Sequence, residues 1–319
     1  MMHWQKLGQI FDFSSSSFTN RYASHAQSPQ ALVLEDRIRI YFSTRTNDAP
    51  GQFLSHVQYV DYDFDLKTII DSSKHEVLSL GKRGCFDEHG IFPLSPVRVG
   101  DKIYGYTNGI SRRVSVAVET GAGLAISTDS GYTYQRVGDG PVVSATTDEP
   151  FLVGDPFVRV FDEKFHMFYL FGKKWSDATD DAHAERVYKI GHATSDNGID
   201  WRKTNTSLIP DVIDENECQA LPTVIKLDNR YHMYFCFRHM KGFRDDATKG
   251  YRLGYAYSDD LKQWNRDDSQ VGISVSDEGW DSEMMCYPNI FECNNEVYLL
   301  YNGNNFGRDG FGIAKLTDR

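Results

Sequence analysis

The chain has 319 residues, of which 40% are apolar and 13% aromatic, enough for one large domain or two small ones. Its formal net charge of -11 argues against a broad basic surface, so we do not expect a nucleic-acid partner. The opening sequence MMHWQKLGQIFDFSSSS lacks a basic start followed by an apolar run, and no stretch is long enough to span a bilayer. These features predict a cytoplasmic protein without a membrane partner.

A proline-marked segment recurs five times along the chain. Each copy has an apolar run, a turn rich in Asp, Asn or Gly, and a second run that ends in Tyr or Phe, which is the pattern of a β-hairpin. The prolines lie 63 to 66 residues apart and are Pro29, Pro93, Pro156, Pro222 and Pro288. In several copies a third run ends in an aromatic turn, and a short fourth run follows. Four antiparallel strands repeated five times predict an all-β fold, a single five-bladed β-propeller over residues 1–319.

The two ends of the chain complement each other. The last copy stops after its third run, FGIAKLTDR, whereas the chain begins with HWQKLGQIFD, which matches fourth runs elsewhere such as WRKTNTSLIP. We therefore expect the N-terminal strand around Trp4 to pair with the segment from Phe311 to Leu316 and to close the last blade. The turns STDSGYTY and TSDNGIDW match the Asp-box pattern, and we expect Asp129 and Asp196 to bond the turn backbone.

Acidic residues gather just before the prolines. In a propeller the innermost strands run in one direction, so these positions converge on one mouth of the central channel. The candidates are Asp155, directly before its proline, Glu88, Glu217 and Glu283, five residues before theirs, and the adjacent Asp87 and Asp281. Crowded carboxylates raise one another's pKa, so that one stays protonated beside an ionised partner, and glycoside hydrolysis needs such a pair.

Cations follow the aromatic strand ends in the loops that the topology places at the same mouth. Arginine suits bidentate recognition of carboxylate or phosphate, so we expect an anionic substrate such as a uronate, a nonulosonate or a sugar phosphate. The candidate substrate-binding residues are His25, Glu88, Arg45, Trp175, Arg238, Asp281 and Arg308. The alternative is that these cations pair with acidic residues of the same mouth.

The sequence resembles the five-bladed propeller glycosidases, the broad group that contains glycoside hydrolase families 32, 43, 62, 68, 117 and 130. The GDP motif looks like the one whose Asp stabilises the transition state or tunes the acid, which implies that role for Asp155. The ECQALP motif is similar to the family 32 motif and to the family 43 acid of the fourth blade, which implies that Glu217 is the proton donor. The Asp that the pattern places in the first blade as base or nucleophile has no counterpart, because RYASHAQSP offers only His25. Glu283 or Asp87 would then act as the base.

Three functions stay open at this stage. The first is a glycosidase of the inverting type acting on a carbohydrate or sugar conjugate, the second a transglycosylase or phosphorylase, and the third a non-catalytic carbohydrate-binding propeller. The chain most resembles a glycosidase-like subgroup associated with bacterial surface-polysaccharide synthesis. No ligand spacing predicts a metal, no cofactor is expected, and the five cysteines, which form no CxxC pair, predict free thiols.

Overall fold

The computed structural model describes residues 2–176 and 184–318. Its strands come in groups of four, one group for each proline-marked repeat. The first two groups are β2 (Ser24–Val33), β3 (Ile38–Asn47), β4 (Phe53–Tyr62) and β5 (Ile69–Ser72), then β6 (Gly90–Val99), β7 (Lys102–Arg112), β8 (Val118–Ser127) and β9 (Gln135–Arg136). The next two are β10 (Phe151–Phe161), β11 (Lys164–Trp175), β12 (Arg186–Ser195) and β13 (Arg202–Lys203), then β14 (Cys218–Leu227), β15 (Arg230–Arg238), β16 (Arg252–Ser258) and β17 (Asn265–Arg266). The last is β18 (Cys286–Cys293), β19 (Glu296–Asn302), β20 (Gly310–Asp318) and β1 (His3–Asp12).

Helical structure in the described residues is confined to single turns. These are three 3-10 turns, Ser17–Asn20, Ala247–Lys249 and Asp268–Gln270, and the four-residue α1 (Asn304–Gly307). The all-β class predicted from the sequence is therefore confirmed. No helix in the described ranges has the length and apolar character needed to cross a membrane.

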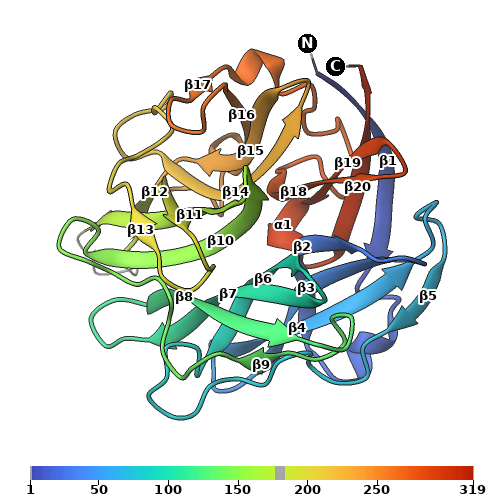
Figure 1. Cartoon of the computed structure of the whole chain (residues 1–319), viewed down its shortest axis with the longest axis horizontal. Coiled ribbons are helices and arrows are strands. Elements are labelled where there is room, and N and C mark those ends of the chain that lie inside the picture. Colours follow the sequence, from blue (N-terminus) through green and yellow to red (C-terminus); the bar gives the residue numbers. More distant parts are fainter. Residues whose placement is uncertain (1, 177–183, 319) are drawn as a thin grey trace.

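The strands form antiparallel sheets that surround a common centre (Figure 1). Three sheets have four strands, and a fourth joins β2–β5 to β6–β9 through one parallel bridge between Ser55 and Gly90. The first strand of each group packs against that of the next, in the cycle β2, β6, β10, β14, β18 and back to β2. In the last sheet β1 pairs with β20, with Trp4 opposite Leu316 and Phe11 opposite Phe311. The two ends of the described chain thus share one sheet.

The proline of each first strand coincides with an interruption of the ladder. The pairing of β10 with β11 shifts register between Gly154 and Phe157, and the same shift occurs at the proline of the other first strands. Proline has no N–H to donate to a ladder, and an irregularity of this kind re-aims the neighbouring side chain. The residue before the proline has a positive φ in four strands, namely Ser28 (52°), Asp155 (49°), Leu221 (47°) and Tyr287 (58°). Non-glycine residues seldom adopt this conformation, and it turns these side chains out of the regular pleat.

The Asp-box turns hold their backbone in two ways. Asp129 accepts a hydrogen bond from the backbone N–H of Thr133 at 3.0 Å, as expected. In the second turn it is Asn197 that bonds the backbone, because its Oδ1 accepts hydrogen bonds from the N–H groups of Ile199 and Asp200 at 2.9 Å. The expectation for Asp196 was wrong, because its side chain is exposed and lies 3.4 Å from Lys164.

Candidate active site

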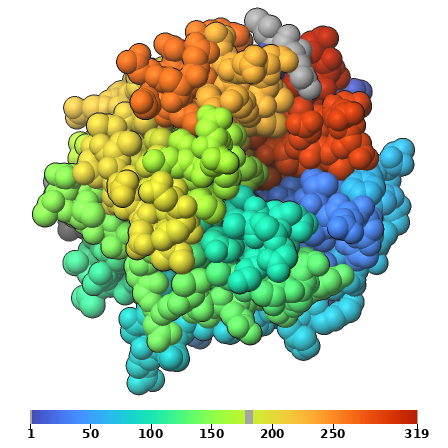
Figure 2. Space-filling view, viewed as in Figure 1, coloured from blue at the N-terminus to red at the C-terminus, as the bar shows by residue number. Residues whose placement is uncertain are grey.

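A cavity of about 970 Å³ opens among the first three strands of the sheets. Every sheet contributes to its wall, including Gln27 of β2, Phe92 of β6, Asp155 of β10, Ala220 of β14 and Tyr287 of β18. The surface seen in Figure 2 is hollowed near its centre, where the segments coloured blue, green and red meet. The volume is at the upper end of the range for small-molecule sites.

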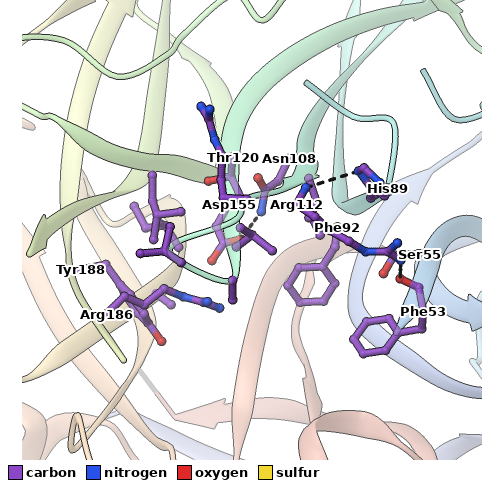
Figure 3. A pocket seen from close by; sticks show the side chains of 18 of the residues that line it. Phe53, Ser55, His89, Phe92, Asn108, Arg112, Thr120, Asp155, Arg186 and Tyr188 are labelled. Atoms are coloured by element: carbon purple, nitrogen blue, oxygen red, sulfur yellow. Dashed lines mark hydrogen bonds between the residues drawn. The ribbon is translucent and has the colours of Figure 1, made fainter. Parts of the chain in front are cut away.

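Asp155 is the only carboxylate among the described residues that line this cavity. Its side chain accepts a hydrogen bond from Asn108 Nδ2 at 3.1 Å, and these two residues lie at the middle of the close-up in Figure 3. Burial raises the pKa of Asp155 to about 7, although the charge of Arg186 and the hydrogen bonds from Asn108 and the backbone of Leu221 favour the ionised form. A carboxyl group with this pKa can both hold and release a proton near neutral pH.

The rest of the wall is aromatic and basic. In Figure 3 Arg186 and Tyr188 lie on one side of Asp155, and Phe53 and Ser55 lie on the other. The cations among the described lining residues are Arg45, Arg112, Arg113 and Arg186, and the large aromatic residues are Phe53, Phe92, Tyr188, Tyr251 and Tyr287. A site with one acid and four arginines favours an oxygen-rich, negatively charged ligand over a cationic one.

The structure places Glu217 outside the cavity, although the sequence motif implied that it is the proton donor. Its side chain is fully buried and lies 2.5 Å from Arg266, and it accepts hydrogen bonds at 3.0 Å from the backbone N–H groups of Val212 and Ile213. Burial would raise the pKa of Glu217, but the Val212 N–H and the Arg266 guanidinium outweigh it and hold that pKa below its usual range. The structure thus does not bring the Glu217 carboxylate to the wall of the cavity, where a proton donor would have to meet the substrate.

The other predicted carboxylates are also absent from the cavity wall. Asp87 pairs with Arg136 at 2.5 Å and Asp281 pairs with Lys6 at 2.6 Å, and both acids are buried. These two ion pairs tie the strand starts to neighbouring segments. The structure therefore does not bring Asp87 to the site as a base, nor Asp281 as a substrate ligand.

Two predicted residues lie closer to solvent. Glu88 accepts a hydrogen bond from the backbone N–H of Gly84 at 2.8 Å, within its own loop. Glu283 is exposed, and its backbone N–H donates to Asn304 Oδ1 at 2.8 Å. The carboxyl groups expected to form the acid and base pair are thus dispersed, and only Asp155 reaches the cavity.

Only some of the predicted substrate-binding residues line the cavity. Arg45 lines the cavity, whereas His25 is not among the lining residues and has Nδ1 2.6 Å from Ser24 Oγ. Arg308 is exposed and does not line the cavity either. Burial, with the charges of Arg45 and Arg308, lowers the pKa of His25 to about 3, so this ring is neutral at physiological pH.

Arg238 and Trp175 support the wall from outside. The Arg238 guanidinium lies 3.5 Å from the ring centre of Phe243 and 5.4 Å from those of Tyr188 and Tyr251, and the last two rings line the cavity. The ring centre of Trp175 lies 5.8 Å from the guanidinium of Arg186. Both residues therefore act on the shape of the cavity through the side chains that face it.

Two proteins of known sequence are similar to the whole chain. The uncharacterised proteins MT1551 and Rv1502 of Mycobacterium tuberculosis are each 33% identical to it over 319 residues, which is 99% of this chain and 100% of either relative. The chain belongs to their family. No family model matches it.

Solved structures show the same fold. One structure of a glycoside hydrolase has a TM-score of 0.74 and 14% identity, covering 98% of this chain and 92% of the other. A thermostable family-43 glycoside hydrolase has a TM-score of 0.61 and 14% identity, covering 92% of this chain and 88% of the other. The predicted likeness to the propeller glycosidases is confirmed at the level of the fold.

Several cavity residues were not predicted from the sequence. Phe92 and Tyr287 directly precede their prolines, as Asp155 does, so the repeat held a signal for them. Asn108 lies within β7 and Arg186 is the first residue of β12, and nothing in the sequence distinguishes them from other polar strand residues. Within residues 2–176 and 184–318, no group of three or more His, Cys, Asp or Glu side chains is arranged to hold a metal ion.

Proposed function

We propose that this protein acts on a glycosidic bond of a carbohydrate or sugar conjugate, with Asp155 as the proton donor. The observation that carries the proposal is the position of Asp155, which lies on the wall of the cavity with a pKa near 7. Cleavage of a glycosidic bond requires protonation of the leaving oxygen, and a general acid works best when its pKa is near the working pH. The fold of the glycoside hydrolases supports this reaction class, and Phe92, Tyr188 and Tyr287 offer ring faces for a sugar.

The contacts of Asp155 suit a donor that must change its charge. Asn108 and the Leu221 N–H fix the orientation of the carboxyl group, and Arg186 stabilises the carboxylate that remains after proton transfer. Burial acts in the opposite direction and keeps the acid protonated in a large fraction of the molecules near neutral pH. Asp155 then gives its proton to the leaving oxygen as the bond between that oxygen and the anomeric carbon breaks.

Phosphorolysis is a second candidate, favoured by the charge of the wall. Hydrolysis uses a second carboxylate to activate water or to form a covalent intermediate, and the described lining residues offer only Asp155. Phosphate is itself a nucleophile and needs cations rather than a carboxylate base. In this reaction a phosphate oxygen bonds to the anomeric carbon, the glycosidic bond breaks, and the proton of Asp155 goes to the leaving oxygen. The products are a sugar 1-phosphate and a free hydroxyl.

The detailed architecture is part of the same proposal. We interpret the five strand groups as the blades of one propeller domain over residues 1–319, with β1 as the outer strand of the fifth blade. The cyclic packing of the first strands and the pairing of Trp4 with Leu316 support this interpretation. The channel of such a ring would place the five residues before the prolines around one axis, which is where Asp155 meets the cavity.

The experiment is a screen of methyl glycosides and methyl glycosiduronates, each with and without 10 mM phosphate, in which the released methanol and the sugar products are measured. The wild-type protein, Asp155→Asn and the matched surface control Asp101→Asn are compared, because Asp101 is exposed and lies outside the cavity wall. We expect turnover of at least one substrate that falls by about 10² or more in Asp155→Asn and is unchanged in Asp101→Asn. Dependence on phosphate with formation of a sugar 1-phosphate identifies the phosphorylase. Binding of sugars without turnover of any substrate would contradict the enzymatic proposal and favour the carbohydrate-binding alternative.

A further inference from the structure

Arg45 and Ser55 stand opposite each other on one wall of the cavity. Arg45 of β3 is the direct cross-strand partner of Ser55 of β4 in an antiparallel pair, so the two side chains lie on the same face of the sheet. Both residues line the cavity, and Ser55 is only 4% exposed. The sheet therefore holds a guanidinium and a hydroxyl next to each other, where a ligand can contact both.

The guanidinium of Arg45 is positioned without being neutralised. It stacks on the ring of Phe53, 3.8 Å from the ring centre, and its Nε is buried without a hydrogen-bond partner among the described residues. Burial lowers the pKa of Arg45 to about 10, whereas the usual effect of an acidic partner is to raise it. Within residues 2–176 and 184–318, no carboxylate lies at ion-pair distance from this side chain.

Two of the other three arginines of the wall, Arg112 and Arg113, differ from Arg45. Arg112 lies 2.5 Å from Asp48, and Arg113 lies 3.3 Å from Glu119, so each has an acidic partner from the protein. A cation that is largely buried and unpaired is unfavourable, and an anionic ligand removes that cost when it binds. Among these three cations, Arg45 is the one for which the described protein supplies no anion.

We propose that Arg45 and Ser55 form a subsite for an oxyanion, either the acid group of the sugar substrate or free phosphate. This inference rests on the proposed function, because it assigns the charged group of the same substrate or its co-substrate. The guanidinium offers two parallel N–H groups to the oxyanion and the Ser55 hydroxyl offers a third donor. Phe53 keeps the guanidinium plane in place, so little side-chain freedom is lost on binding.

The test measures binding by isothermal titration calorimetry, with D-glucuronate, D-glucose 1-phosphate, inorganic phosphate and neutral D-glucose as probes. The variants are Arg45→Gln, Arg45→Lys and Ser55→Ala, with Arg230→Gln as the control for loss of one positive charge. Arg230 pairs with the exposed Asp259 and does not line the cavity. We expect at least one of the three anions to bind at least tenfold more tightly than D-glucose. Arg45→Gln should weaken that binding about 10- to 100-fold, Arg45→Lys and Ser55→Ala should weaken it less, and Arg230→Gln should leave it unchanged.

The probes separate the two sources of the oxyanion. Tight binding of D-glucuronate assigns the subsite to the acid group of the sugar, whereas tight binding of inorganic phosphate, or of D-glucose 1-phosphate as the product of phosphorolysis, without tight binding of D-glucuronate assigns it to a free co-substrate. The inference is overturned if no anion binds tenfold more tightly than D-glucose, or if the preference survives in Arg45→Gln. Should Arg45→Gln fail to fold, Arg45→Lys and Ser55→Ala give the same readout. Because binding requires no turnover, failure of this test is distinguishable from the absence of glycosidic cleavage.

Discussion

Asp155 and Glu217 are two buried carboxylates at equivalent ends of neighbouring sheets, and their surroundings are opposite. Asp155 reaches the cavity, has no cation at ion-pair distance among the described residues, and has a pKa raised to about 7. Glu217 is enclosed by Arg266 and two backbone N–H groups, and its pKa is lowered. The chemistry of each carboxylate is therefore set by its contacts, which differ more than the two sequence motifs suggest.

The two carboxylates stand at different distances along the chain from the proline of their strand, and this explains their different surroundings. Asp155 directly precedes Pro156, at the irregularity that turns a side chain out of the pleat, whereas Glu217 stands just before the start of β14. One position aims at the central cavity and the other at the outer strand β17, which carries Arg266. Four predictions test this division of roles, from the largest expected effect to the smallest.

The largest effect should come from Asp155→Asn, which keeps the shape of the side chain and removes its proton. We expect turnover of a substrate with an alkyl leaving group to fall by about 10² to 10⁴, because that oxygen must be protonated as it leaves. A 2,4-dinitrophenyl glycoside leaves without protonation, so its turnover should fall much less. Steady-state rates of both substrates measure this contrast, and an equal loss on both would remove Asp155 from the role of acid.

Glu217→Gln should lower the free energy of unfolding and leave turnover nearly unchanged. The variant leaves the buried Arg266 guanidinium without its main partner, and breaking a buried pair of this kind costs about 3–5 kcal/mol. We expect a loss of about 3 kcal/mol, at the low end of that range, because Asp268 still lies 2.9 Å from Arg266. Urea unfolding measures the free energy, and turnover of the folded protein should stay within about threefold of wild type. A stable but inactive Glu217→Gln protein would reverse the assignment.

The third prediction concerns pH. A general acid must be protonated, so kcat/KM should fall about tenfold per pH unit above about pH 7, the pKa of Asp155. The same raised pKa affects stability, since the unfolded carboxyl loses its proton near pH 4 and the folded one only near pH 7. The favourable contribution of the neutral group is thus complete below pH 4 and is lost as the pH rises to 7. Asp155→Asn should accordingly raise the melting temperature at pH 8 and change it little at pH 4, which thermal unfolding at the two pH values measures.

The smallest effect is expected for Glu283→Gln. This side chain is exposed, so its loss should change the free energy of unfolding by less than about 0.5 kcal/mol. Turnover should also be unchanged, because Glu283 lies outside the cavity wall. A loss of turnover by tenfold or more in this variant would restore Glu283 as the base that the sequence analysis considered.

The sequence predicted the features that repeat, and it failed where one repeat differs from the others. The proline spacing predicted the strand groups, and the position of Asp155 before its proline predicted that it faces the centre. The partner of Glu217 could not be predicted in this way, because Arg266 lies 49 residues further along the chain on a two-residue strand. Arg45 could be predicted because it follows an aromatic strand end, but its lack of an acidic partner depends on contacts that only the three-dimensional structure defines.

The pairing of β1 with β20 has a consequence for the synthesis of the protein. Residues 3–12 leave the ribosome long before their partner strand, which begins only at Gly310. At 5–20 residues per second, this strand waits on the order of 15 to 60 s before its partner is made. During that time the backbone donors and acceptors of β1 lack their partner strand, so β1 can pair with a strand of another chain before β20 is made.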